Sequence, residues 1–308
     1  MEHPAPNCLN LAFTIPALNT FTIKDIENFT GIKAHTIRIW EQRFQLFQAR
    51  RKDTNHRIYD GDDLKTLLRI AYLYHHGVKI SRIAALSEPQ QNELSLEIAS
   101  KGASPMLPIH ELIAATLDYD HLHFERIFSS QVLHLGFERC ITQVIYPYLE
   151  RIGVLWLTGN VIPAQEHFSS NIIRTKIMTA IDGLPMNGDA KAHYLLFLPE
   201  GEFHEIPLLF VQYLLKKHGQ LVTSFGANVP LPDLQPFITR KKVTHLYTHL
   251  LTNVTQQAMQ RFITDLSTQF PDVSILLSGP QTWQLKQPLP ANVFVVRQLD
   301  KLLEAGRR

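Results

Sequence analysis

The chain has 308 residues, of which 45% are hydrophobic and 19% are charged, so it is long enough for two or three packed domains and too apolar to be disordered or fibrous. The formal net charge is only +2, yet lysine and arginine outnumber aspartate and glutamate between positions 21 and 87. This asymmetry is typical of a nucleic-acid-binding segment attached to a neutral body.

The cysteine content and the hydropathy exclude several classes of protein. Cys8 and Cys140 are the only cysteines and neither has a Cys-x-x-Cys neighbour, which argues against a disulfide framework or a cysteine zinc site and favours a reducing cytoplasm. The histidines lack acidic or cysteine partners at ligand spacing, so no zinc is expected. No apolar run is long enough to cross a bilayer, and residues 1–20, with three prolines, are predicted to form a flexible tail.

Residues 21–87 predict a helix-turn-helix followed by a basic wing and two further helices. Thr22 and Asp25 have the spacing of an N-terminal capping pair, and Thr30-Gly31 ends the first helix. In the second helix, Ile37, Trp40 and Phe44 share one face, whereas His35, Arg38, Gln42 and Arg43 fall on the face that a major groove would meet.

The wing is the segment QARRKDTNHRIYD, in which basic residues alternate with His56 and Tyr59. Arginine and lysine supply charge to phosphates, and a tyrosine hydroxyl can donate to a phosphate oxygen. Asp60 and Asp63 then begin a third helix that ends near Gly77, and a short fourth helix covers residues 80–86.

The run HTIRIWEQRF, the wing ending in HRIYDGDDL and the segment GVKISRIAAL together resemble the winged-helix DNA-binding domain of the MerR family of transcription regulators. The resemblance and the basic wing assign DNA contact to seven residues: Thr36, Arg38, Arg43, Arg50, Arg51, Arg57 and Tyr59. The sequence departs from the family at Ile39, where a second aromatic residue is common. The alternative from the residues alone is a generic helical bundle with a solvated basic loop.

Beyond the head, the composition predicts a linker and two further domains. Residues 88–108 are polar, with glycine and two prolines near the end, and are predicted to be a linker with one or two helical turns. Residues 109–185 show helical spacing with four breaks and predict a four-helix bundle. Residues 190–308 alternate short branched or aromatic runs with helical segments, which predicts a doubly wound parallel sheet of flavodoxin-like type.

The loop after the first strand of that sheet reads EGEFHEIP and lacks the glycine fingerprint of dinucleotide-binding proteins. It resembles the acid-x-His-x-x-Gly loop of cobalamin-binding domains, which implies His204 as the lower axial ligand of cobalt and Glu202 as its hydrogen-bonding partner. Other positions of that pattern correspond to Thr248, Leu250, Ser278 and Gly279, which are implied cofactor contacts.

The bundle segment WLTGNVIPAQEH resembles the Trp-x9-Glu-His signature of the light-responsive, cobalamin-dependent MerR regulators. The resemblance implies that Trp156, Glu166 and His167 cover the upper face of a corrin ring, the bundle serving as a cap. Pro207 stands where the loop pattern has glycine, and Leu157 stands where photoreceptors of the group carry histidine, so the bis-histidine form of light switching is not expected.

These patterns predict a sequence-specific MerR-type transcription regulator, not an enzyme, whose body senses cobalamin between the helical cap and the parallel-sheet domain. The resemblance implies promoter DNA as partner, a homodimer or homotetramer as assembly, RNA polymerase as a further candidate partner, and no membrane. The alternative is a cofactor-independent regulator whose degenerate cobalamin-type body serves oligomerisation or binding of a protein partner.

Overall fold

The structure, a computed structural model, describes residues 21–47, 50–51, 57–101, 106–157, 161–185, 190, 192–252, 255–285 and 288–297. The predicted tail over residues 1–20 lies outside the described residues. The chain divides into two compact units, Met1–Ser169 and Ser170–Arg308. Among the described residues, no helix combines the length and the apolar character that a membrane span requires.

The first helices form where the sequence places start and stop signals. Strand β1 (Phe21–Thr22) leads into α1 (Ile23–Thr30), and the predicted capping pair is confirmed: the Thr22 hydroxyl accepts from the Asp25 amide at 3.3 Å, and the Asp25 carboxylate accepts from the Thr22 amide at 2.8 Å. α1 ends at Gly31, whose φ of 69° is the left-handed conformation of a C-terminal cap.

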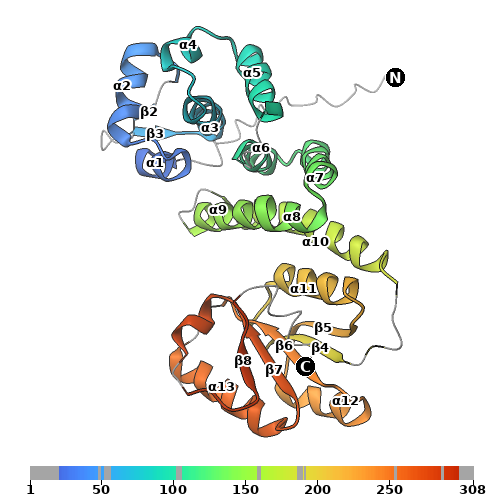
Figure 1. The fold of residues 1–308 in the computed structure, drawn as a ribbon. Helices are drawn as coiled ribbons and strands as arrows, with labels where there is room; N and C mark the ends of the chain where they lie inside the picture. The colour runs from blue at the N-terminus through green and yellow to red at the C-terminus, as the bar shows by residue number, and fades with distance from the viewer. Residues whose placement is uncertain are drawn as a thin grey trace, which may run out of the picture. The chain divides into compact units, whose positions relative to one another are not determined.

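The head is built around α3 (Gly61–His75), which Asp60 and Asp63 begin with a reciprocal capping box. α2 (Ala34–Phe44) and α4 (Ile80–Ala84) complete the helices predicted for this segment (Figure 1). α3 is apolar on most of its circumference, and its buried residues are Leu64, Leu67, Leu68, Ile70, Ala71, Tyr72 and Leu73. A helix of this kind must be covered by neighbours on more than one side.

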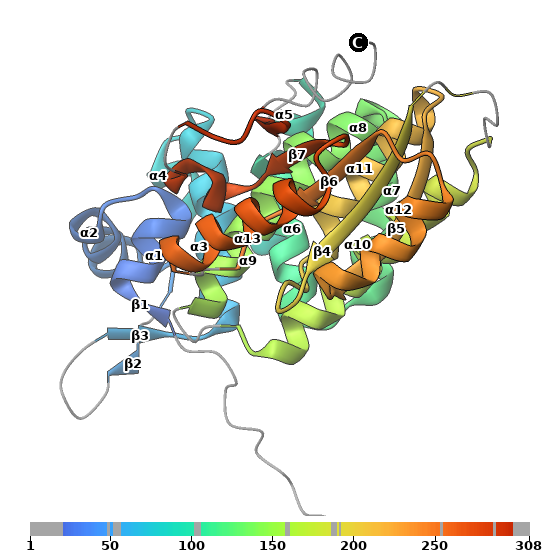
Figure 2. The same ribbon diagram turned by 90° about the horizontal axis from the view of Figure 1, so that it is seen from below.

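The wing is a small antiparallel sheet in the order β1-β3-β2 (Figure 2). β2 (Arg50–Arg51) pairs with β3 (Arg57–Tyr59), and β3 also pairs with β1, so that Phe21 lies opposite Tyr59. The wing is therefore fastened to the start of the head through backbone hydrogen bonds.

The segment predicted as a linker, residues 88–108, contains a full helix instead, α5 (Glu88–Lys101), which packs against α3. Its buried contact face carries Gln91 and Ser95 in place of apolar residues. The Gln91 amide donates to the Ile83 carbonyl at 3.1 Å, and the Ser95 hydroxyl donates to the Gln91 carbonyl at 2.8 Å. Hydrophobic periodicity missed this helix because the two side chains described as buried in it are polar and locally satisfied.

Helical segments follow through residue 182. They are α6 (Met106–Leu117), α7 (His121–Leu135), α8 (Phe137–Cys140), the π-helical turn η1 (Ile141–Ile145), α9 (Tyr146–Leu157) and α10 (Pro163–Asp182). α6 packs against α3 of the head and against α7 and α9. The head and the helices α6 to α9 thus belong to the same compact unit, and the division from the second unit falls within α10.

The second unit holds a five-stranded parallel sheet in the order β5-β4-β6-β7-β8. Its strands are β4 (His193–Pro199), β5 (Leu221–Val229), β6 (His245–His249), β7 (Ser274–Ser278) and β8 (Val293–Val295). The order starts at an inner strand and moves outward in both directions, which is the predicted doubly wound topology of flavodoxin-like type.

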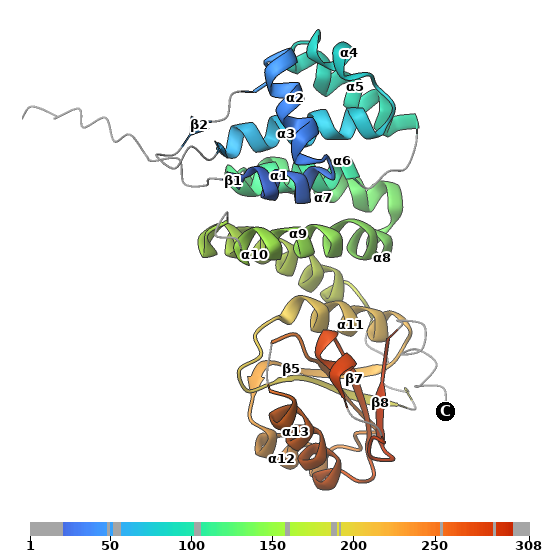
Figure 3. The ribbon, with the colours of Figure 1, turned by 90° about the vertical axis from the view of Figure 1, so that its left-hand side faces the viewer.

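Helices cover both faces of this sheet, as Figure 3 shows: α11 (Glu205–Lys217) lies on one face, and α12 (Gln235–Arg240) and α13 (Gln256–Gln269) lie on the other. Alternate residues of β4 enter the two cores, Leu196 on the α11 side and Leu195 on the α13 side. A strand buried on both faces reads as a continuous apolar run, and YLLFL has that character.

Candidate nucleic-acid interface and cofactor site

The outward face of α2 carries the residues that the sequence assigns to the major groove. Ile37 and Trp40 are buried, and Arg38, Gln42 and Arg43 are exposed, as the helical spacing predicts. Among the other assigned residues, Thr36 is half-buried and hydrogen-bonds the His35 ring at 3.3 Å, and the Arg43 guanidinium lies 5.4 Å from the centroid of the Phe44 ring.

Arg57 of the wing is engaged inside the head. Its Nε donates to Glu41 Oε2 at 2.7 Å, and the two side chains are only 22% and 16% exposed. Water screens this partly buried pair less than a surface salt bridge, and removing either partner would leave the other charge poorly solvated. Arg57 therefore ties β3 to α2, a role that the sequence did not predict, since Glu41 and Arg57 are far apart in the chain.

The structure contradicts the phosphate contact predicted for Tyr59. Its side chain is 1% exposed and packs edge-on against Phe47, with ring centroids 6.1 Å apart. Burial raises the pKa of its hydroxyl to about 12, and that hydroxyl has no hydrogen-bond partner among the described residues. Tyr59 is a core residue of the head, because the alternation of β3 turns it inward.

The remaining wing arginines lie in β2. Arg50 is exposed and forms an ion pair with Asp60 at 3.0 Å. Arg51 pairs with Arg57 through the backbone ladder, and its side chain lies outside the described residues. Arg38, Arg43 and Arg50 are thus the assigned cations that the structure places at the surface of the head.

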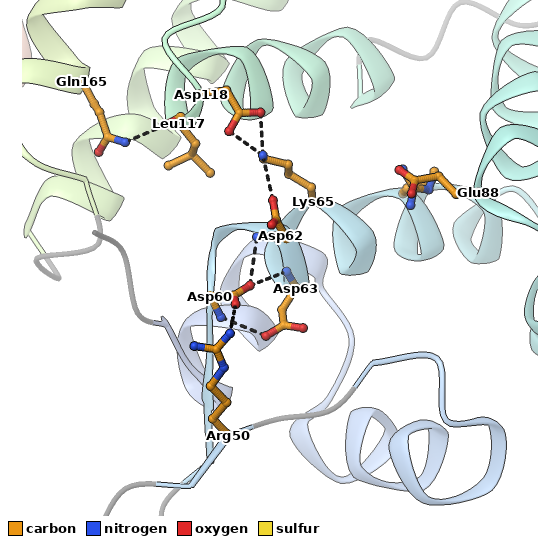
Figure 4. Close-up of polar contacts among 10 residues, drawn as sticks. Arg50, Asp60, Asp62, Asp63, Lys65, Glu88, Leu117, Asp118 and Gln165 are labelled. Atoms are coloured by element: carbon orange, nitrogen blue, oxygen red, sulfur yellow. Dashed lines mark hydrogen bonds and ion pairs between the residues drawn. The ribbon is translucent and has the colours of Figure 1, made fainter. Parts of the chain in front are cut away.

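A chain of polar contacts joins the wing to the helices that follow the head (Figure 4). The Asp60 carboxylate that binds Arg50 also caps α3, and one turn further Lys65 Nζ reaches Asp62 at 3.1 Å and Asp118 at 2.5 Å. Asp118 directly follows α6. Lys65 and Asp118 therefore link the head to the first helix of the cap by a direct ion pair.

The residues that the resemblance assigns to the upper face of a corrin ring lie at the end of α9 and at the start of α10. Trp156 is 51% exposed in the last turn of α9. In the first turn of α10, Glu166 Oε2 lies 2.7 Å from His167 Nδ1. The preceding residue, Gln165, is buried and donates to the Leu117 carbonyl at 3.0 Å, which fixes the start of α10 against the end of α6. The side chain of Leu157 lies outside the described residues.

In the second unit, Glu202 and His204 form the contact that the sequence predicts. They lie in the loop between β4 and α11, at the carboxyl edge of the sheet, where ligands of doubly wound folds bind. His204 Nδ1 lies 2.5 Å from Glu202 Oε1, and its side chain is half exposed. Glu202 is only 3% exposed. An acceptor on Nδ1 holds the imidazole proton there, so that the lone pair of the ring lies on Nε2.

Glu202 also joins two loops of the sheet. Its Oε2 accepts from the amides of Leu251 and Thr252 at 2.9 and 2.6 Å, in the loop after β6. Burial opposes ionisation of this carboxyl, but the hydrogen bonds from the His204 ring and these amides outweigh it and lower its pKa to about 2. The carboxylate is thus ionised and fully engaged at neutral pH.

The other assigned positions lie beside this loop. Thr248 is 1% exposed, and its hydroxyl has no hydrogen-bond partner among the described residues. Gly279 has a φ of 96°, and a Cβ there would clash with the backbone of Leu250, so the loops after β6 and β7 touch at a point where only glycine fits. Ser278 instead bonds inward, its hydroxyl lying 2.8 Å from the ring of His249 and 2.6 Å from the Tyr247 hydroxyl.

This donor set fits a cobalt corrinoid bound through imidazole. The histidine is oriented by a buried acid, and the unsatisfied Thr248 hydroxyl is a polar atom for which a ligand could supply the partner. Pro207, in place of glycine, occupies the first turn of α11, where the missing N–H removes no helical hydrogen bond. Among the described residues, no group of three or more His, Cys, Asp or Glu side chains is arranged to hold a metal ion.

Comparisons with known proteins agree with these two parts. Residues 21–88 match the MerR HTH family regulatory protein model, and residues 108–180 match the B12 binding domain model. The chain is 30% identical over 224 residues to the HTH-type transcriptional repressor CarH of Myxococcus xanthus, covering 71% of this chain and 74% of that one. It is 27% identical over 221 residues to the HTH-type transcriptional repressor CarA of the same organism, covering 70% and 71%.

Among solved structures, a monomethylamine corrinoid protein of Methanosarcina barkeri superposes with a TM-score of 0.49 at 14% identity, covering 62% of this chain and 92% of that one. The winged helix-turn-helix and the B12-type body define a DNA-binding transcription regulator with a B12-binding domain. The chain belongs to the MerR family of regulators and is similar to its relatives CarH and CarA.

The Glu41–Arg57 pair yields a testable expectation. Glu41→Gln and Arg57→Gln should each destabilise the head by about 2 kcal/mol, and the double variant should cost no more than either, because both remove the same contact. Each should weaken binding to a duplex selected by the wild type while leaving its salt slope unchanged. Urea unfolding and binding titrations at several salt concentrations measure both effects.

Two matched variants complete this test. Arg38→Gln, at an exposed position, should reduce the log–log salt slope by about 0.9 for each head bound to the duplex, without loss of stability, because each head loses one phosphate contact. Tyr59→Phe should leave binding unchanged. A salt slope that falls with Arg57→Gln while Glu41→Gln is harmless would show that Arg57 contacts phosphate directly.

Glu202 should govern the acid stability of the second unit. Its folded pKa lies below its ordinary value of 4.5, so the stabilisation is fully present above about 4.5 and is lost as the pH falls toward about 2. Between those pH values the wild type should lose on the order of 3 kcal/mol more than Glu202→Gln. Denaturant unfolding as a function of pH measures this difference. Glu200→Gln, at an exposed neighbouring position, should keep the wild-type profile, and identical profiles for all three proteins would contradict the assignment.

Proposed function

We propose that this regulator senses a cobalamin, with His204 Nε2 as the lower ligand of cobalt. The observation that carries the proposal is the short contact between the half-exposed His204 ring and the buried Glu202 carboxylate. When bound, cobalamin supplies a cobalt centre whose upper ligand can be exchanged, so the protein can respond to its chemical state. The matches to the B12 binding domain and to the CarH and CarA repressors support this reading.

Several residues of the chain would contact the bound cobalamin. Glu202 keeps the imidazole proton on Nδ1 and raises the donor strength of Nε2. Thr248 would offer its unsatisfied hydroxyl to a polar group of the ligand, and Gly279 lets the loops after β6 and β7 approach closely. We further propose Trp156, Glu166 and His167 of the helical segment as ligand contacts, because the exposed indole and the Glu166–His167 pair present apolar and polar groups.

The output would be a change in how the head binds promoter DNA, and we propose repression as the mode because CarH and CarA carry that name. One head covers one half-site, so a two-fold dimer or a tetramer on a palindrome is the assembly proposed. Release of the operator to RNA polymerase in the cytoplasm would complete the switch. The protein would act without catalysing a reaction, since its relatives are transcription regulators.

The ligand assignment is tested by electron paramagnetic resonance of the full-length protein loaded with cob(II)alamin. Protein labelled with nitrogen-15 only in histidine should show a changed hyperfine pattern, because the two nitrogen isotopes differ in nuclear spin. His204→Ala should lose this isotope effect, and Glu202→Gln should retain it with weaker binding, by about 10- to 100-fold. His249→Ala, at a ring that bonds Ser278, should keep the isotope effect.

The outcomes of this test separate the two readings of the body. Absence of any spectral change on adding cobalamin would favour the cofactor-independent regulator, in which Pro207 and the inward hydrogen bonds of Ser278 close the site. Binding with no histidine isotope effect would leave a cobalamin protein in which His204 is not the ligand.

The contact between head and cap makes a second expectation. Asp118→Asn removes the acid that binds Lys65 from the cap side, whereas Asp62→Asn removes the partner on α3 itself. If the cap acts on the head through this pair, Asp118→Asn should reduce the effect of cobalamin on operator affinity by up to about fivefold, with cobalamin affinity unchanged. Asp62→Asn should preserve the effect. Equal behaviour of both variants in binding titrations would place the coupling elsewhere.

A further inference from the structure

Ile39 is a large apolar side chain in the middle of the outward face of α2. It is 51% exposed, and its neighbours on that face are polar: His35 precedes it by one turn, and Gln42 and Arg43 follow it by one turn. The opposite face, with Ile37 and Trp40, is the one that packs into the head. Ile39 is therefore not one of the buried core residues of the head, and it lies among residues assigned to DNA.

No aromatic or core contact within the described head explains why the apolar side chain of Ile39 lies at the surface. Tyr74 is the other large apolar residue of the described head with comparable exposure, at 42%, and its ring packs edge-on against Trp40 with centroids 4.9 Å apart. Single exposed apolar residues are common on protein surfaces. Ile39 is distinguished by its place on the helix that enters the major groove, where a bound duplex would cover it.

We propose that Ile39 is a specificity-determining residue that reads thymine through its C5-methyl group. That methyl is the apolar group that base edges present in the major groove, and apolar side chains recognise it by contact. A β-branched side chain is held in one preferred rotamer within a helix, so its methyl groups have a fixed position. The polar neighbour Gln42 can read hydrogen-bonding groups of the bases, and Ile39 adds a contact that no hydrogen bond supplies.

The test is a double-mutant cycle between the protein and the DNA. A duplex is selected from a random library by the full-length wild-type protein, and each thymine of a half-site is then replaced singly by uracil, which lacks only the methyl group. At one thymine per half-site, the replacement should weaken wild-type binding about fourfold. This is the change in Kd that corresponds to the free energy of burying one methyl-sized group. Ile39→Ala should bind the original duplex more weakly by a similar factor and should be insensitive to that replacement.

Conservative and stability controls accompany the cycle. Ile39→Val keeps the branched Cβ and should retain most of the sensitivity to uracil. Ile39→Ala should unfold at the wild-type temperature, because the residue it replaces is not part of the core. Losses that simply add at every thymine, or an Ile39→Ala protein with wild-type affinity and selectivity, would overturn the proposal and leave Ile39 as an ordinary surface residue.

Discussion

The first unit depends on the burial of α3 from several sides at once. Its apolar residues contact α1, α4 and α5 of the amino-terminal region and also α6, the first helix of the body. An interface of this apolar kind cannot be opened without exposing a large hydrophobic area to water. The DNA-binding head is therefore packed against α6 and is not joined to it by a flexible linker alone. The ion pairs of Arg50 with Asp60 and of Lys65 with Asp118 add polar contacts to this apolar packing.

Local signals in the sequence predicted local structure well. The capping pair of Thr22 and Asp25, the left-handed Gly31 and the apolar run of β4 each depend on residues that are close in the chain, and each is present. The alternation of strands and helices likewise gave the doubly wound sheet, because connection rules leave few topologies for such a pattern. The predictable elements were those whose formation depends on residues within one helical turn or one strand.

The predictions that were wrong or incomplete concern features that depend on contacts between residues far apart in the chain or on polar burial. α5 was missed because Gln91 and Ser95, the side chains described as buried in it, bind backbone groups rather than apolar neighbours. Tyr59 was assigned to phosphate from its place in a basic segment, although pairing of β3 on both edges turns it into the core. The partnership of Arg57 with Glu41 depends on two elements meeting in space, and no spacing rule contains that information.

The Glu41–Arg57 pair also has a consequence for the DNA itself. The pair fastens the wing to α2, and these are the two parts of the head to which the sequence assigns DNA contact, so it restricts the separation between them. If α2 and the wing keep a fixed separation, the DNA must bend or untwist for both to contact it. The energy of bending or untwisting then depends on base steps that no side chain touches, and the operator would be selected partly by the stiffness of its untouched base pairs.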